Sequence, residues 1–237
     1  MSLVRSSHEK SNNNKNYYNL LDKVINNDIK EVQKLICSND INLTLLDDDN
    51  CSLTYHAAIN ENWEIFHILI TNGSDINTSD SVYNISPIHL CAYYGNLKAI
   101  NTLISITKFL KLISLDVLLN VVTKYENVTP LYISSDYGYL NIVTSLIKNG
   151  ANLNQADNNG STPLYIASKN GHFEIVKELI NANACINQTN NDNMTPLCIA
   201  NRHSHTNIVN FLILNGANGA NGALKANADD LPVVGSI

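Results

Sequence analysis

The chain is 237 residues long, with 44% hydrophobic residues, 15% charged residues and a net charge of −6 at pH 7. Because 15 Lys and Arg face 21 Asp and Glu, the chain lacks the basic excess that binds phosphate backbones, and nucleic-acid binding is not expected. The strongest apolar run, 103–122, is interrupted by Lys108, Lys111 and Asp116, each costly at the centre of a bilayer. We therefore expect no membrane span.

Sequence motifs of common catalytic sites are missing. There is no glycine-rich phosphate loop ending in Lys-Ser/Thr, no His-Glu-x-x-His and no Gly-x-Ser-x-Gly. The cysteines are odd in number and show no paired spacing for zinc or disulfides, which favours a reducing compartment. We expect no enzyme, no cofactor and no metal, and a cytoplasmic location, with the nucleus or secretion without a classical signal peptide as alternatives. The cysteines are Cys37, Cys51, Cys91, Cys185 and Cys198.

The N-terminal part begins with residues 1–16, which are polar and asparagine-rich and are predicted to form a disordered tail. A first, partial repeat is predicted to begin near residue 17, because Ile-Lys-Glu-Val at 29–32 resembles a segment that recurs later. Three aspartates, 47–49, precede Asn50 in a predicted turn. We interpret them as a solvated loop, or alternatively as an acidic fingertip that contacts a basic partner.

From residue 52 onward, one pattern recurs. Thr-Pro-Leu occurs three times at a spacing of 33 residues, and an earlier Ser-Pro-Ile copy lies 43 residues before the first of these. The longer step indicates an insertion of about ten residues, and the fixed period indicates that one structural unit is stacked repeatedly. The copies start at Ser52, Ser86, Thr129, Thr162 and Thr195.

Each copy carries the local signals of two short helices joined by tight turns. Thr or Ser followed by Pro predicts a helix N-cap and the first helical position. Nine residues after the start, a glycine can end this helix in a left-handed conformation, and a second helix with apolar residues at helical spacing follows. Two residues before the start lies a residue that tolerates positive φ. The glycines are Gly95, Gly138 and Gly171, and the turn residues are Asn50, Asn84, Asn127, Gly160 and Asn193.

With its Thr-Pro-Leu core, its helix-ending glycine, its Asn-Gly-Ala-x-x-Asn close and its 33-residue step, the chain resembles the ankyrin-repeat family. The resemblance covers 17–217 and implies an all-α solenoid of about six helix-loop-helix units, with β-turn fingers and a concave binding face. Leu53 in place of Pro and Glu61 in place of Gly weaken the resemblance in the second unit. The units start near residues 17, 52, 86, 129, 162 and 195.

One position in the first helix of each unit is expected to stabilise the fold rather than to bind a partner. His89 occupies the position where the family's histidine hydrogen-bonds the backbone of the neighbouring turn, so the resemblance implies the same role here. Tyr132 and Tyr165 occupy the equivalent position and are also expected to be structural.

The resemblance also implies which residues face the concave groove. These are the two positions before the helix-ending glycine, together with the fingers. Two of the groove pairs carry tyrosine, and cationic residues follow toward the C-terminal end. The groove positions are Ile59 and Asn60, Tyr93 and Tyr94, Asp136 and Tyr137, Lys169 and Asn170, and Arg202 and His203, and the fingers add Tyr83 and Tyr125.

Tyrosine and arginine dominate interface hot spots because they bring a large contact area at low rotamer cost. We therefore hypothesise that the five tyrosines anchor a protein or peptide partner, while Lys169 and Arg202 pair with its acidic groups. The alternative is that the tyrosines pack between adjacent fingers or reflect a biased composition.

The insertion, about residues 105–117, is more apolar than one lengthened helix end requires. We expect an extra helix on the convex back of the solenoid, packed within the chain. Alternatively, residues 104–118 form a second interaction surface or a self-association contact, although we expect a monomer. After the repeats, residues 218–237 begin with repeated Asn-Gly-Ala and are predicted to be a flexible tail.

Together these features predict a non-catalytic protein–protein interaction module, acting as a scaffold, adaptor or inhibitor. The alternative is a regulatory ankyrin-repeat fragment of a larger enzyme or transporter whose catalytic part lies outside this chain.

Overall fold

A computed structural model describes residues 15–38, 41–111 and 113–218. Within these ranges the regular secondary structure is helical, with an isolated β-bridge between Leu46 and Ser52, which confirms the predicted all-α class. The chain divides into two compact units between Lys124 and Tyr125. Unit 1 is the part up to Lys124 and unit 2 the part from Tyr125.

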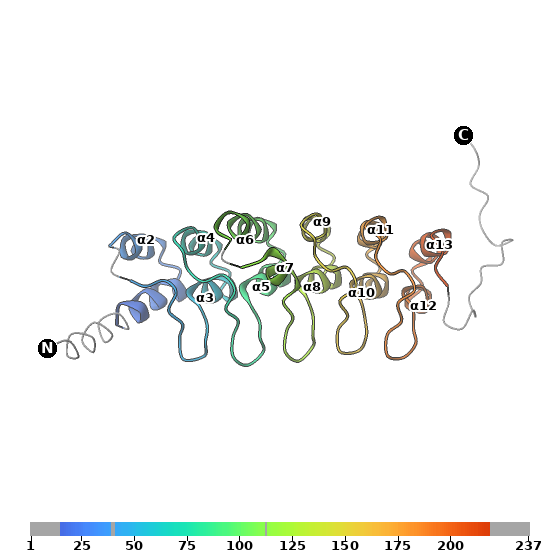
Figure 1. Cartoon of the computed structure of the whole chain (residues 1–237), viewed down its shortest axis with the longest axis horizontal. Helices are drawn as coiled ribbons and strands as arrows, with labels where there is room; N and C mark the ends of the chain where they lie inside the picture. The colour runs from blue at the N-terminus through green and yellow to red at the C-terminus, as the bar shows by residue number, and fades with distance from the viewer. Residues whose placement is uncertain (1–14, 39–40, 112, 219–237) are drawn as a thin grey trace, which may run out of the picture. The chain divides into compact units, whose positions relative to one another are not determined.

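Unit 1 consists of helix pairs stacked side by side (Figure 1). A helical segment over residues 15–25 precedes the first labelled helix. First helices of neighbouring pairs contact each other, as α3 and α5 do, and so do the second helices α4 and α6. The helices are α2 (Ile29–Cys37), α3 (Leu53–Ile59), α4 (Trp63–Thr71), α5 (Pro87–Tyr93), α6 (Leu97–Leu110) and α7 (Leu115–Asn120).

Unit 2 repeats this arrangement more regularly. Helix α10 packs between α8 and α12, and α11 packs between α9 and α13. Figure 1 shows the two rows, with the loops that we call fingers extending beyond the first helices. The helices are α8 (Pro130–Asp136), α9 (Leu140–Lys148), α10 (Pro163–Asn170), α11 (Phe173–Asn181), α12 (Pro196–Arg202) and α13 (Thr206–Leu214).

The predicted N-caps begin the first helices of unit 2. The side chains of Thr129, Thr162 and Thr195 each accept a hydrogen bond from the backbone N–H three residues on, and a proline follows in each case. Each such cap is worth about 1 kcal/mol because it satisfies a donor that the helix leaves unpaired. The Thr-Pro pattern therefore sets where each repeat begins.

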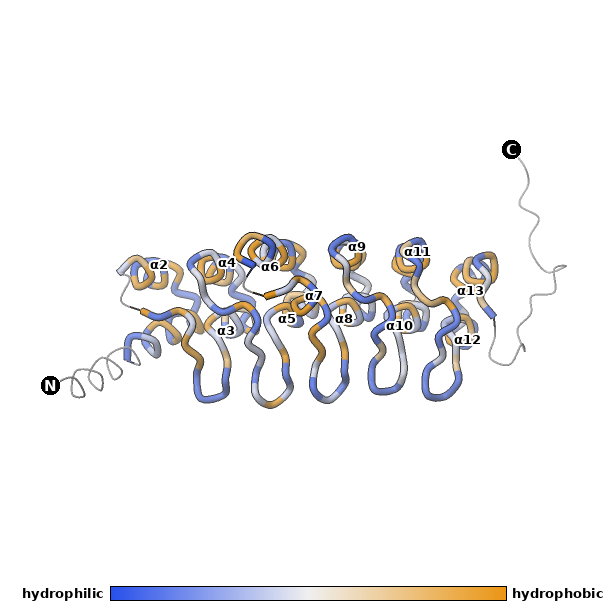
Figure 2. The backbone as a smooth tube through the Cα atoms, viewed as in Figure 1, coloured by the Kyte–Doolittle hydropathy of each residue, from blue (hydrophilic) through white to orange (hydrophobic). Residues whose placement is uncertain are grey.

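Apolar side chains from both rows form the core of each unit. Leu131, Leu164 and Leu197, from equivalent positions of the three first helices of unit 2, are fully buried. Figure 2 shows that hydrophobic residues concentrate in the helices, whereas the fingers are mostly hydrophilic. No single repeat can bury such a stripe by itself, so burial requires the stack.

The fingers turn at the predicted positions. Asn50, Asn84, Asn127 and Asn193 have φ of +65°, +55°, +59° and +58°, and Gly160 has φ of +76°. Three of these asparagines also connect neighbouring fingers, because each side-chain amide donates to a carbonyl of the next one. The bonds run from Asn50 to Ser79, from Asn84 to Val122 and from Asn127 to Ala156, at 3.2, 2.7 and 2.9 Å.

The insertion lengthens one helix and adds another. Helix α6 has 14 residues, against nine in α4, and ends at Lys111 in a left-handed conformation. The added helix α7 contacts α6 and buries Leu118 and Leu119. The extra helix is thus present, while its predicted place on the convex back stays a prediction.

The predicted tails lie mostly outside the described residues. Residues 15 and 16 belong to the first helical segment, so the boundary predicted at residue 16 is too late. At the other end, the backbone N–H of Asn218 donates to Asn187 Oδ1 at 2.7 Å. No helix in the described part of the chain combines the length and apolar character that crossing a bilayer requires.

Candidate protein-binding surface

The predicted surface residues of unit 1 differ in exposure. Tyr83, in a finger, and Tyr93, at the end of α5, expose 55% and 48% of their surface. Tyr94 is half-buried: its hydroxyl donates to the carbonyl of Ile59 at 3.2 Å, and its ring meets Trp63 edge-on at 6.0 Å. For Tyr94 the packing interpretation therefore applies, while Tyr83 and Tyr93 present aromatic area to solvent.

In unit 2, Tyr125 and Tyr137 are also exposed, at 59% and 46%. The Tyr137 ring stacks on Tyr139 with a centroid distance of 6.0 Å and an interplanar angle of 10°. Such stacking restricts the ring without covering it, which is favourable for binding because little rotamer freedom is lost on contact.

Asp136 and Asn170 bind each other. Asn170 Nδ2 donates to the backbone carbonyl of Asp136 at 2.9 Å and to its Oδ1 at 2.7 Å. The His172 ring lies 2.9 Å from the same carbonyl. Since a carbonyl only accepts, Nε2–H of His172 is the donor. This pair therefore joins two repeats and leaves less bonding capacity for a partner than the sequence predicted.

The cationic residues lie at the ends of α10 and α12. Lys169, Arg202 and His203 are exposed, and Lys169 forms no ion pair with any described residue. His205 Nε2 donates to the Lys169 carbonyl at 2.9 Å, and the His203 ring stacks on His205 at 6.1 Å. Arg202 Nη1 donates to the sulfur of Met194 at 3.7 Å. Both cationic side chains are exposed and can meet acidic groups.

The predicted residues belong to two units, and we name each set by its unit. The unit 1 surface consists of Tyr83, Tyr93 and Tyr94. The unit 2 surface consists of Tyr125, Asp136, Tyr137, Lys169, Asn170, Arg202 and His203.

Tyr132 and Tyr165 are structural, as expected. The Tyr132 hydroxyl donates to Asp157 Oδ2 at 3.0 Å, and the Tyr165 hydroxyl accepts from Asn190 Nδ2 at 3.3 Å. Burial and the neighbouring Asp157 raise the pKa of Tyr132, so this hydroxyl stays protonated. Both tyrosines join a first helix to the following finger.

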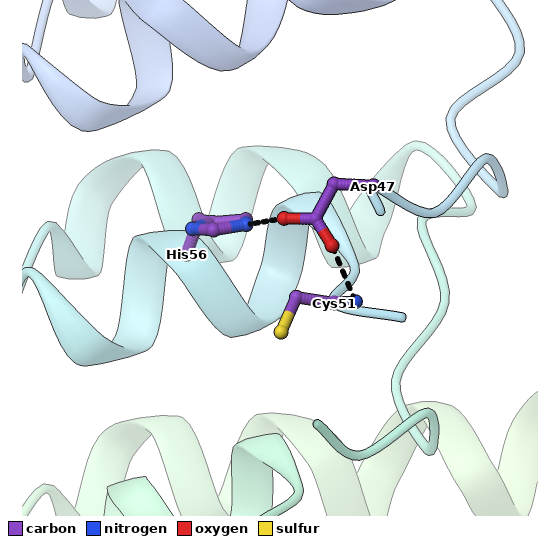
Figure 3. Close-up of side chains that lie close together, drawn as sticks. All are labelled: Asp47, Cys51 and His56. Atoms are coloured by element: carbon purple, nitrogen blue, oxygen red, sulfur yellow. Dashed lines mark hydrogen bonds and ion pairs between the residues drawn. The ribbon is translucent and has the colours of Figure 1, made fainter. Parts of the chain in front are cut away.

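A cluster that the sequence analysis missed lies between the first finger of unit 1 and helix α3 (Figure 3). Asp47, Cys51 and His56 each place a metal-binding atom within 4.8 Å of the other two. His56 Nε2 lies 2.6 Å from Asp47 Oδ2, and both side chains are largely buried. Asp47 is therefore not the solvated loop residue that was predicted. The signal in the sequence is Asp-x3-Cys-x4-His, which a search for paired cysteines overlooks.

Hydrogen bonding stabilises the charged form of Asp47. Burial opposes its charge, but the N–H of Cys51, the His56 ring and the N–H of Asp49 outweigh this effect, so the pKa of Asp47 is lowered. Burial and the charges of Asp47, Asp80 and Asp49 raise the pKa of the Cys51 thiol to about 12. The cluster is therefore an ionised carboxylate beside a neutral thiol.

Comparison with known proteins identifies the fold. The sequence model described as ankyrin repeats (3 copies) matches residues 20–113, 55–157 and 131–222. The chain belongs to the ankyrin-repeat family. The crystal structure of an ankyrin repeat domain from Acinetobacter baumannii AYE is also similar, with a TM-score of 0.74 and 26% identity, over 85% of this chain and 100% of that one. The search of curated proteins found no match.

Membership confirms the resemblance inferred from the repeats. Ankyrin repeats are generally protein–protein interaction modules, and the fold is typically non-catalytic. The exposed aromatic and cationic residues are consequently best considered as candidates for contact with a protein.

Proposed function

We propose that this ankyrin-repeat protein is a non-catalytic scaffold, adaptor or inhibitor that binds a protein partner through the ends of its first helices and its fingers. The observation that carries the proposal is the exposure of aromatic or cationic side chains at the same repeat position in three repeats, one of unit 1 and two neighbouring ones of unit 2. In the repeat that starts at Thr129 this position is the half-buried Asp136. Tyr93, Lys169 and Arg202 each lie seven residues after the N-cap, and each is exposed. Within unit 2, the packing of α10 against α12 holds Lys169 and Arg202 in neighbouring repeats, so a partner meets a preorganised surface there.

The chemistry of the two surfaces supports a protein rather than a small molecule. Exposed tyrosines supply broad contact area, and Lys169 and Arg202 supply charges that pair with acidic groups. We propose that the unit 1 surface contributes aromatic contacts and the unit 2 surface adds recognition of acidic residues.

Separate variants of each surface test the proposal. One carries Tyr83→Ala and Tyr93→Ala, and the other carries Tyr137→Ala, Lys169→Ala and Arg202→Ala. Partners captured from native lysate are quantified by mass spectrometry. We expect at least one variant to lose a partner that the unchanged chain retains, since hot-spot residues contribute about 2 kcal/mol each, or roughly 30-fold in affinity.

The control is Phe109→Ala, which removes an aromatic residue that is 84% exposed and lies on neither surface. Circular dichroism establishes that all variants are equally folded. If both surface variants retain every partner, or if the Phe109 variant loses the same ones, neither surface is the binding site. Tyr94 is left unchanged because its packing against Trp63 would confuse folding with binding.

We also propose that the chain is monomeric and cytoplasmic. The odd number of cysteines supports a reducing compartment. Phe109 and Val117 expose 84% and 49% of their surface within the insertion, so self-association there is the competing arrangement. Sedimentation velocity should give one monomeric species whose mass is unchanged by Phe109→Ser. A dimer that this substitution dissociates would establish self-association instead.

A further inference from the structure

Three side chains from the first finger of unit 1 and the following helix α3 combine the donor atoms that bind zinc. Asp47 offers a carboxylate oxygen, Cys51 a thiol sulfur and His56 an imidazole nitrogen, all within 4.8 Å of one another. Figure 3 shows the carboxylate facing the ring, with the Cys51 side chain beside them and its sulfur turned away from the carboxylate. Oxygen, nitrogen and sulfur ligands of this kind are those that Zn²⁺ uses in proteins.

The backbone holds these three residues in place. Asp47 Oδ1 accepts hydrogen bonds from the N–H of Asp49 at 3.0 Å and of Cys51 at 2.8 Å, which closes the finger turn. Ser52 then caps α3, and His56 follows one turn into that helix. The other carboxylate oxygen, Oδ2, is thereby turned toward the imidazole.

The fold itself does not require the cysteine or the histidine. In the finger of unit 2 that precedes α10, Asp157 Oδ1 accepts from the N–H of Asn159 and Ser161 in the same way, at 2.9 and 2.7 Å. There Ser161 stands at the position of Cys51 and Ile166 at that of His56. The same turn thus forms without a thiol or an imidazole. In the first finger the Cys51 thiol donates to the Asp49 carbonyl at 3.7 Å and the His56 ring bonds Asp47, which are additions that the turn itself does not require.

We propose that Asp47, Cys51 and His56 bind one zinc ion. On binding, the Cys51 thiol gives up its hydrogen bond to the Asp49 carbonyl and releases its proton to solvent. His56 Nε2, the donor to the ionised Asp47, loses its proton to solvent while Nδ1 carries the remaining ring proton, and the bond between His56 and Asp47 is replaced by bonds from each to the metal. The carboxylate and the thiolate then balance the two charges of the ion, while the imidazole is neutral. Water completes a tetrahedral site with three protein ligands.

The required movement is small. Tetrahedral zinc with ligand distances near 2.0–2.3 Å places its ligand atoms about 3.5 Å apart. The donor atoms that lie farthest apart, up to 4.8 Å, need to approach by about 1.3 Å, whereas His56 Nε2 and Asp47 Oδ2, which are 2.6 Å apart, need to separate by about 0.9 Å. Side-chain rotation supplies movements of this size. The carboxylates of Asp49 and Asp80 also act on Cys51, and their negative potential favours a divalent cation at this place.

Cobalt substitution tests the site with the full chain. Co²⁺ is added to metal-free protein, and the near-ultraviolet charge-transfer absorption from thiolate to cobalt is followed, before Zn²⁺ is added to displace it. We expect saturation at one ion per chain and loss of the band on adding zinc. Cys51→Ser should abolish the band, and His56→Gln should weaken binding by more than the roughly 10–100-fold that outer-shell partners contribute.

Cys185→Ser and His203→Gln are the matched controls, because both side chains are exposed and lie in the other unit. Both variants should bind cobalt as the unchanged chain does. Absence of a band, or an equal band in Cys51→Ser, would overturn the proposal and leave the cluster as an ion pair beside a buried thiol.

Thermal unfolding provides a second readout that remains valid if one variant is destabilised. Saturating Zn²⁺ should raise the Tm of the unchanged chain and of both control variants, because a ligand that binds only the folded state stabilises it. Cys51→Ser and His56→Gln should show no such increase. Equal increases in all variants would place the bound zinc elsewhere. This test does not depend on the protein partner.

Discussion

Replacing His89 with alanine is expected to lower the free energy of unfolding by roughly 2–4 kcal/mol. His89 is 1% exposed, and its ring joins two separate segments of unit 1. Nδ1 accepts from the N–H of Ser86 at 3.1 Å, and Nε2 lies 3.0 Å from the carbonyl of Val121. Since the carbonyl only accepts, the ring is the tautomer that carries its hydrogen on Nε2.

The size of this effect follows from what the substitution leaves behind. Alanine removes the partner of the buried Ser86 N–H and of the Val121 carbonyl, and it leaves a cavity in place of the ring. Val121 follows α7, so this bond is where the inserted segment returns to the repeat. The variant should therefore loosen the end of the insertion as well as the start of α5.

Trp63 allows this loss to be measured locally. It is the only tryptophan of the chain and lies in unit 1, so its fluorescence during urea unfolding reports on the unit that contains His89. Tyr132→Phe is the control, because it removes one hydrogen bond, to Asp157, from the equivalent position in unit 2, at a cost of about 1 kcal/mol. Since Trp63 lies in unit 1, the stability of this variant is measured by circular dichroism, which is also recorded for the His89 variant. His89→Gln, which keeps a donor toward Val121, should recover part of the stability. An alanine variant as stable as Tyr132→Phe would contradict the proposed role.

The features that local rules determine could be predicted from the sequence. A Thr-Pro start or a positive-φ asparagine acts through its own backbone, so helix starts and finger turns follow from three or four neighbouring residues. The structural role of His89 could be predicted only with the help of the family resemblance. Its partner Val121 lies 32 residues away, beyond an insertion whose course no local pattern predicts.

The functions of single polar residues were harder to predict. Apart from the asparagines expected at positive φ, no asparagine was predicted to have a structural role. Asn158 nevertheless donates to the carbonyl of Tyr125, and Asn191 donates to the carbonyl of Asn158, so both connect neighbouring fingers. Tyr93 and its neighbour Tyr94 were both predicted to anchor a partner, whereas the Tyr94 hydroxyl donates to the carbonyl of Ile59. In both cases the partner belongs to another repeat, and distance along the sequence does not reveal which side chain reaches it.

The binding surfaces and the Asp47 cluster were also hard to predict, because they depend on which side chains reach one another. The family resemblance implied which residues face the groove, but not that Tyr94 would be half-buried or that Asn170 would bind Asp136. The approach of His56 to Asp47 depends on the side-chain rotamer and on the turn that Asp47 itself closes. A spacing pattern becomes a possible metal site only when three side chains place their donor atoms close together.

Replacing Gly138 with alanine is expected to lower the free energy of unfolding by about 2–3 kcal/mol. Gly138 has φ of +80°, where a side chain costs roughly 1–2 kcal/mol. A Cβ there would lie 2.7 Å from Cε1 of His172, which is too close for contact. The ring would have to move, and its bond to the Asp136 carbonyl would be lost at about 1 kcal/mol.

Gly150 offers a matched control within the same unit. Its φ is +92°, but nothing lies within 4 Å of the position that a Cβ would occupy. Gly150→Ala therefore has only the backbone cost, about 1–2 kcal/mol. Urea unfolding followed by circular dichroism should show a larger loss of unfolding free energy for Gly138→Ala than for Gly150→Ala. Equal losses would mean that the His172 ring moves aside without a cost in free energy.

A double-mutant cycle separates the two contributions to the Gly138 effect. His172→Ala removes the ring, so adding Gly138→Ala in that background should cost no more than Gly150→Ala does. The difference between the two backgrounds measures the coupling between a helix-ending glycine and the histidine of the next repeat. His205 covers Gly171 at the same 2.7 Å and donates to the Lys169 carbonyl. The coupling should consequently recur there, which would make it an interaction between neighbouring repeats that helps to position Asp136 and Lys169 on the unit 2 surface.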